Sequence, residues 1–199
     1  MSTHAYLPET RIKLDEAITY GTPEESLALA QQGLQEAQVY GWLGEIEYFK
    51  GQIALINERF TAAIEHFDAA IKHNPIDGAA YNDRALCMVE MGTIDEALRY
   101  FDKGIEVEPD YATVYHNKGW LLNNIGRHSE AIAYFKKALE LEPHRAVTYD
   151  NLADALANLG DIRGALAAYR KVLEFLKPGR CEEIRQQVSA QIKSLEEKL

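Results

Sequence analysis

The chain has 199 residues with 21 Lys and Arg against 31 Asp and Glu, and its formal net charge of −10 disfavours nucleic acid as a partner. It has no apolar run near the roughly 18 residues that cross a bilayer, and residues 1–20 lack the apolar core of a signal segment, so we expect a cytoplasmic protein with no membrane partner. The two cysteines, Cys87 and Cys181, favour a reducing compartment and are too few for a zinc site.

The first 43 residues are expected to form a degenerate repeat that caps the fold. A short helix is predicted near residues 9–20 and a longer one near 23–39. Thr22 is a good N-cap residue, Pro23 favours the first helical position, and Glu24 places an acid in the first turn. These signals predict a well-defined start for the second helix.

From residue 44 onward the sequence repeats with a period of 34 residues, the spacing that separates Pro75, Pro109 and Pro143. A fixed period of this size indicates a repeat architecture. Two further positions keep the same register, one small and one aromatic. The small residues are Gly51, Ala85, Gly119 and Ala153, and the aromatic ones are Phe67, Phe101, Phe135 and Tyr169.

This pattern of small, aromatic and proline positions resembles the tetratricopeptide repeat family across residues 44–177. The resemblance implies an all-α fold, a right-handed superhelical solenoid of antiparallel helix pairs. Four repeats are expected at 44–77, 78–111, 112–145 and 146–177. Their helices are expected near 42–57, 60–73, 78–91, 94–107, 112–125, 128–141, 146–159 and 162–176.

Local signals place the ends of several of these helices. Thr93 and Glu96 have the spacing of a capping box, and Asp77 and Asp110 each follow a proline closely and are expected to open the next helix. The break at 177–179 ends the last repeat. Residues 178–199 are expected to form one C-terminal capping helix whose apolar stripe is Ile184, Val188, Ile192, Leu195 and Leu199.

The resemblance also implies a binding site. In this family the inner helices line a concave groove, and the repeat positions that packing leaves free hold a peptide of a partner protein. The groove residues expected here are Tyr48, Phe49, Gln52, Asn82, Asp83, Glu90, His116, Asn117, Trp120, Asn123, Asn124, Asp150, Asn151, Asp154 and Asn158.

The chemistry of these positions predicts the kind of ligand. Among all the inner positions there are five acids, including Glu45, and no Lys or Arg. Asn amides can both donate to and accept from a peptide backbone, and Trp120 is a typical anchor residue. We therefore expect a basic or amphipathic segment, although Asn is common at one of these positions in the family and the acids can equally form a solvated face.

One known subfamily mode is disfavoured. Repeat proteins that bind chaperone tails clamp a terminal carboxylate with Lys and Arg in the groove. The corresponding positions here are Tyr48, Gln52, Asn82, Leu86, Val147 and Asn151, and only Asn117 agrees. Arg84 and Lys118 are expected to point along the helix-packing side instead.

No motif for catalysis, a cofactor or a metal is found, so we expect a protein-binding scaffold or adaptor and no enzyme. The single pairing with chemical potential is His116 with Asp150. Two other functions stay open: self-assembly as a homo-oligomer, through the last helix or a terminus, and a chaperone-like role in assembling a larger complex.

Overall fold

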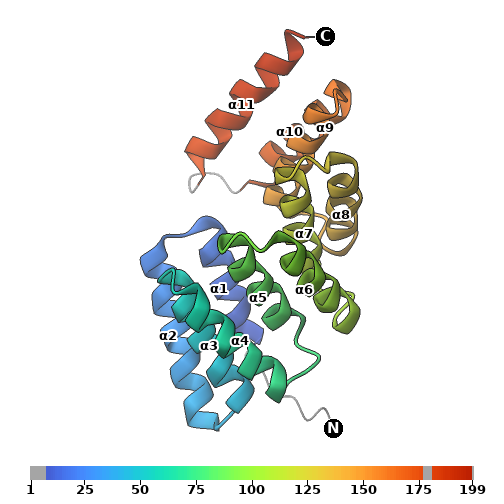
Figure 1. The fold of residues 1–199 in the computed structure, drawn as a ribbon. Coiled ribbons are helices and arrows are strands. Elements are labelled where there is room, and N and C mark those ends of the chain that lie inside the picture. The colour runs from blue at the N-terminus through green and yellow to red at the C-terminus, as the bar shows by residue number, and fades with distance from the viewer. Residues whose placement is uncertain (1–7, 177–180, 199) are drawn as a thin grey trace. The chain divides into compact units, whose positions relative to one another are not determined.

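The computed structural model describes residues 8–176 and 181–198, and within them it is all α-helical (Figure 1). The chain divides into two compact units, Met1–Pro109 (unit 1) and Asp110–Leu199 (unit 2). Unit 1 contains α1 (Pro8–Tyr20), α2 (Pro23–Tyr40), α3 (Leu43–Ile56), α4 (Phe60–His73), α5 (Gly78–Glu90) and α6 (Ile94–Val107). Unit 2 contains α7 (Ala112–Asn124), α8 (His128–Leu141), α9 (Ala146–Asn158), α10 (Ile162–Phe175) and α11 (Glu182–Glu196).

Within each unit every helix packs against the next one in the chain. The first helices of successive pairs also touch, α3 with α5 in unit 1 and α7 with α9 in unit 2. We call these four the inner helices. The predicted all-α repeat fold is confirmed, and the predicted ranges of α1 to α10 agree with the observed ones to within one residue at each end.

The small and aromatic repeat positions meet where the two helices of a pair cross. A Cβ atom added to Gly51 would lie 2.6 Å from Phe67 Cε1, and one added to Gly119 would lie 2.8 Å from Phe135 Cε1. Both rings are fully buried. The glycines therefore allow the inner helix to approach an aromatic ring of its partner to a distance that a side chain would prevent.

The helix caps are fully as predicted at two of four positions. Thr22 and Glu25 form a complete capping box for α2, and the Asp77 side chain accepts from Ala80 N at the start of α5. Thr93 is the N-cap residue of α6 as predicted, but it forms no capping box, because its hydroxyl donates to Met88 O across the preceding turn. The prediction for Asp110 is wrong, since the N-cap of α7 is Tyr111.

The C-terminal helix α11 packs on α10, as the stripe predicts. Val188 and Leu195 are buried, and Arg185 Nη1 donates to Leu173 O at 2.9 Å. The predicted break at 177–179 and Leu199 lie outside the described residues. None of the helices within 8–176 and 181–198 has the length and apolarity to cross a membrane.

Two glycines of α3 provide a test of the crossing. Gly51→Ala should lower the free energy of unfolding by about 1–3 kcal/mol, because the new methyl group overpacks the Phe67 ring. Gly44→Ala is the matched control: its Cβ would be 3.4 Å from His73 Cβ, an ordinary contact, so it should be neutral or stabilise the chain by up to about 1 kcal/mol. Urea unfolding followed by circular dichroism measures both. Equal effects would contradict the packing argument.

Candidate functional site

The predicted groove residues lie on the inner helices, but their exposure to solvent differs between the two units. In unit 1, five of the six predicted residues are buried: Tyr48, Phe49, Gln52, Asn82 and Asp83. Only Glu90 is exposed. The interpretation of these five residues as an accessible binding surface is therefore wrong for this structure. Phe49 is a core residue, because its fully buried ring packs edge-on against Tyr48 at 5.4 Å between centroids.

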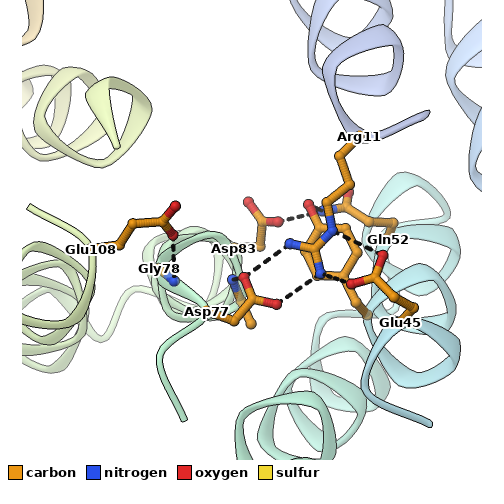
Figure 2. Close-up of polar contacts among 9 residues, drawn as sticks. Arg11, Glu45, Gln52, Asp77, Gly78, Asp83 and Glu108 are labelled. Atoms are coloured by element: carbon orange, nitrogen blue, oxygen red, sulfur yellow. Dashed lines mark hydrogen bonds and ion pairs between the residues drawn. The ribbon is translucent and has the colours of Figure 1, made fainter. Parts of the chain in front are cut away.

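The inner face of unit 1 is covered by Arg11 of α1. Figure 2 shows the guanidinium between Glu45 of α3 and Asp77 at the start of α5. Arg11 Nη1 and Nη2 donate to the two Asp77 oxygens at 2.9 and 2.8 Å. Arg11 Nε and Nη2 donate to the two Glu45 oxygens at 3.2 and 2.5 Å. Both carboxylates are thus held in a bidentate manner, the strongest geometry for this pair.

An aromatic ring completes the arrangement. The Arg11 guanidinium carbon lies 3.5 Å from the centre of the Tyr48 ring, close enough for a cation–π contact. The Arg11 side chain is only 11% exposed, and those of Glu45 and Asp77 are 3% and 6% exposed. Burial alone would lower the pKa of Arg11, but Asp77, Tyr48 and Glu45 together hold that pKa well above its ordinary value. Arg11 is therefore charged, shielded from solvent and paired with Glu45 and Asp77.

Two contacts beside Arg11 fix its position on the rest of unit 1. The Thr10 hydroxyl donates to Glu36 of α2 at 2.8 Å, and Leu14, one turn further along α1, is buried. Arg11 lies outside the predicted site because residues 1–43 do not follow the 34-residue period. The sequence signal that pointed toward it was the absence of any Lys or Arg among the acidic inner positions.

Asp83 lies behind the arginine in a second polar cluster. It accepts from Gln52 Nε2 and, at 2.8 Å, from Asn82 Nδ2 (Figure 2 shows the Gln52 contact). Gln52 Nε2 also donates to the Tyr48 hydroxyl at 3.0 Å. Burial raises the pKa of Asp83 to about 7, although Asn82, Tyr48 and Arg11 oppose the shift; Asp15 of α1 adds to it. This carboxyl is therefore partly protonated near neutral pH.

The raised pKa of Asp83 makes stability depend on pH. Between pH 4 and 7 the folded chain holds a proton on Asp83 that the unfolded chain has lost, so the free energy of unfolding decreases as pH rises through this range. Asp83→Asn removes this titration. The variant's stability, measured by urea unfolding, should fall less steeply than the wild type's by up to about 1.4 kcal/mol per pH unit. Parallel profiles would contradict the shift.

In unit 2 the inner face remains open. Of the nine residues predicted there, His116 is buried; Asn117, Trp120, Asn123, Asp150 and Asn151 are half-buried; Asn124, Asp154 and Asn158 are exposed. Several have local partners: Asn123 Oδ1 lies 2.6 Å from His128 Nδ1, and Asn151 Nδ2 donates to Val147 O at 3.2 Å. Asn123 and Asn151 thus have part of their hydrogen-bonding capacity used within the unit.

The acids of unit 2 form a negative pair on α9. Asp154 accepts from the hydroxyl of Tyr169 on α10. Partial burial raises the pKa of Asp150 to about 6, and the charge of Asp154 adds to the shift. A positive group of a ligand beside these two side chains would relieve their repulsion.

The predicted pairing of His116 with Asp150 is wrong. The imidazole Nδ1 lies 3.0 Å from the Thr148 hydroxyl, and the ring packs against Phe135 at 5.9 Å between centroids. Burial lowers the pKa of His116 to about 3, and Arg145 contributes to the shift. The ring is neutral and inside the fold, so it cannot act as a surface acid or base at neutral pH.

The depressed pKa of His116 can be seen directly. Its imidazole proton resonances should stay constant between pH 8 and pH 5, because the buried ring does not take up a proton in that range. Two-dimensional NMR of the ring, assigned with a His116→Gln spectrum, makes the measurement. The same ring in the urea-unfolded chain is the control and should titrate with a pKa of about 6.5. A midpoint near that value in the folded chain would contradict the burial.

Arg84 and Lys118 point to the packing side, as predicted. Arg84 Nε donates to Asp68 Oδ1 at 2.6 Å, and its guanidinium carbon lies 3.8 Å from the centre of the Tyr100 ring. Lys118 Nζ donates to the Tyr134 hydroxyl at 2.7 Å. Within 8–176 and 181–198, no three His, Cys, Asp or Glu side chains are grouped so as to hold a metal ion.

Comparison with known proteins now identifies the architecture. Three family models, each described as tetratricopeptide repeat, match residues 48–90, 79–143 and 126–177. A stretch of 92 residues is 32% identical to Hsp70-Hsp90 organizing protein 2 of Arabidopsis thaliana, and covers 46% of this chain and 14% of that relative. The chain therefore matches only a small part of this relative's length.

Two solved structures share the fold. A thermophilic tetratricopeptide repeat protein of Thermus thermophilus superposes with a TM-score of 0.72 at 20% identity, over 94% of this chain and 97% of that one. YrrB, described as a tetratricopeptide repeat protein with an unusual peptide-binding site, gives a TM-score of 0.58 at 17% identity, over 93% and 94% of the two chains.

Proposed function

This chain belongs to the tetratricopeptide repeat family, and from that membership we propose that it is an adaptor that binds a segment of another protein, without catalysis. Two similar proteins support this role by their own descriptions, one as an organizing protein of two chaperones and one as having a peptide-binding site. A cytoplasmic location is part of the proposal.

The proposed site is the α7–α9 surface, defined as Asn117, Trp120, Asn124, Asp150, Asn151, Asp154 and Asn158. The observation that carries it is the contrast between the units. Five of the six predicted residues of unit 1 are buried, whereas these seven side chains of unit 2 are exposed or half-buried. A partner can reach these seven side chains without any rearrangement of their unit.

The chemistry of this surface selects a basic or amphipathic segment. Trp120 offers a large apolar face, and tryptophan is among the residues most often found at binding hot spots. Asp150 and Asp154 attract Lys or Arg, and the Asn amides can pair with an extended backbone. The inner helices are held by buried crossings, so the surface is ordered before binding and the flexible segment carries most of the entropic cost.

The proposed ligand is not a peptide whose C-terminal carboxylate is clamped by Lys and Arg. Arg84 and Lys118 are bonded on the packing side, and the α7–α9 surface presents two carboxylates. A terminal carboxylate would be repelled there. Self-assembly through α11 is disfavoured, because Val188 and Leu195 of its stripe are buried on the protein's own surface. A chaperone-like role differs from this proposal only in the lifetime of the complex.

The proposal is tested by selecting random peptides on the purified protein at low and at physiological salt. Peptides containing Lys or Arg should be enriched, more strongly at low salt. Trp120→Ala should weaken binding of a selected peptide about 30-fold, the effect of losing about 2 kcal/mol at a hot spot. Trp42→Ala, the chain's other tryptophan, is the control and should leave the affinity unchanged.

Asp154→Asn tests the electrostatic part separately. The asparagine keeps an oxygen that can accept from Tyr169, but it removes the charge. Affinity should fall several-fold at low salt and much less at high salt, because added salt screens an exposed pair. Unchanged affinity in both Trp120→Ala and Asp154→Asn would remove the α7–α9 surface as the site.

A further inference from the structure

We propose that Glu45, Tyr48 and Asp77 form an arginine-recognition site, which α1 occupies with Arg11, and that an arginine-bearing amphipathic helix of a partner protein binds there by displacing α1. We call these three residues the arginine site. It lies wholly within unit 1 and shares no residue with the α7–α9 surface.

The geometry of the site selects a guanidinium group. Two carboxylates meet the planar fork from two sides, with four N–H···O contacts between 2.5 and 3.2 Å, and the Tyr48 ring covers one face at 3.5 Å (Figure 2 shows the hydrogen bonds). A lysine ammonium has no planar face for the ring and cannot bridge both carboxylates in this bidentate way. The site is therefore built for arginine rather than for positive charge in general.

The arginine site is not a property of every repeat. Two periods of 34 residues after Glu45 and Asp77, the chain has Thr113 and Arg145. Arg145 Nη1 donates directly to the Thr113 hydroxyl at 2.8 Å, so the corresponding place in unit 2 lacks both acids and carries its own cation. The carboxylate pair thus belongs specifically to the part of the chain that α1 covers.

Helix α1 buries little apolar surface in unit 1. Leu14 is its one buried apolar side chain among the residues described, whereas Ile12 and Ile18 are 68% and 51% exposed. Burying one leucine gives a helix only a modest apolar contribution to its attachment. The net contribution of a buried ion pair is small, because separation returns both charges to water. Release of α1 therefore exposes few apolar side chains, and the ion pair contributes selectivity for arginine more than net stability.

Helix α1 is also an imperfect ligand for this face. Asp15, four residues after Arg11 and so on the same side of the helix, adds to the shift that raises the pKa of Asp83, which means that the two acids repel each other. A partner helix that has Arg, an apolar residue three positions later and a neutral residue at the fourth would keep the favourable contacts of Arg11 and Leu14. It would also avoid this repulsion and so compete with α1.

The experiment uses the full chain and a fluorescein-labelled peptide with the sequence of residues 8–22. Three forms of the peptide are compared: the parent, one with Asp15→Asn, and one with citrulline, the neutral isostere of arginine, in place of Arg11. Fluorescence anisotropy measures their binding to the wild-type chain and to Arg11→Gln, which vacates the arginine site without adding a charge.

The parent peptide should bind Arg11→Gln at least about tenfold more tightly than it binds the wild type, since it no longer competes with an arginine in place. Asp15→Asn should tighten binding further, and citrulline should weaken it at least about tenfold, because two buried carboxylates lose their partner. Asp77→Asn added to Arg11→Gln keeps an N-cap residue for α5 and should reduce the preference for arginine over citrulline, because only Glu45 and Tyr48 remain to recognise the guanidinium.

A measurement on the wild-type chain covers the case in which Arg11→Gln fails to fold. Saturating Asp15→Asn peptide should speed amide hydrogen exchange in residues 8–20, as α1 leaves the site. Unchanged exchange, or equal binding of the arginine and citrulline peptides, overturns the proposal. A concentration-dependent dimer of the wild-type chain that the peptide dissolves overturns it in favour of a second copy of this chain as the occupant.

Trp120→Ala distinguishes this site from the adaptor surface. The substitution should leave binding of the arginine peptide to Arg11→Gln unchanged, because Trp120 is not part of the arginine site. Loss of that binding would assign the peptide to the α7–α9 surface and overturn the inference. Failure of the selected peptides in the earlier experiment would leave the arginine site standing.

Discussion

The whole structure depends on one recurring constraint, the close approach of two helices where a small residue meets an aromatic ring. Gly51 and Gly119 face Phe67 and Phe135, and a single added methyl group would overlap either ring. This contact sets how closely the helices of the α3–α4 and α7–α8 pairs approach, and Ala85 and Ala153 are the small residues at the same position in the other two pairs. Repetition of the pair every 34 residues then fixes the spacing of the inner helices within a unit. The positions of the inner-face side chains follow from it.

The same constraint explains why the fold could be predicted from the sequence while half of the site could not. The helix boundaries recur at the same positions in every repeat. The wrong predictions of a capping box at Thr93 and of a cap at Asp110 therefore did not shift any helix. The site in unit 1 depends instead on a contact made once. Arg11 lies 34 residues before Glu45 and 66 before Asp77. Although it stands one full period before Glu45, residues 1–43 lack the aromatic and proline positions of the repeat, so the periodicity did not mark Arg11 as a partner of the acids. The acidic inner positions indicated that a cation was needed, but they did not indicate which of 21 would supply it.

Burial changes what an acidic residue does in the two units. In unit 1 the carboxylates of Glu45 and Asp77 are buried, so each needs a charged partner for as long as it stays out of water, and removing the partner without rehydrating the carboxylate is costly. In unit 2 Asp154 keeps its contact with water and needs no such partner. The first arrangement gives selectivity with little net stability, and the second gives salt-dependent attraction with little selectivity.

Helix α1 covers the acidic face of unit 1, so its side chains must fit the groups of that face. The contacts of Arg11 therefore indicate which chemical groups unit 1 can bind. They are a guanidinium between two carboxylates and above a tyrosine ring, and an apolar side chain one helical turn later. One residue of α1, Asp15, fits this face poorly. Asp15 of α1 raises the pKa of Asp83, so the two carboxyl groups disfavour each other's charged forms across this interface. In the proposed exchange this opposition favours a partner helix without the acid, because a ligand shifts an equilibrium only by the difference between its affinities for the two states.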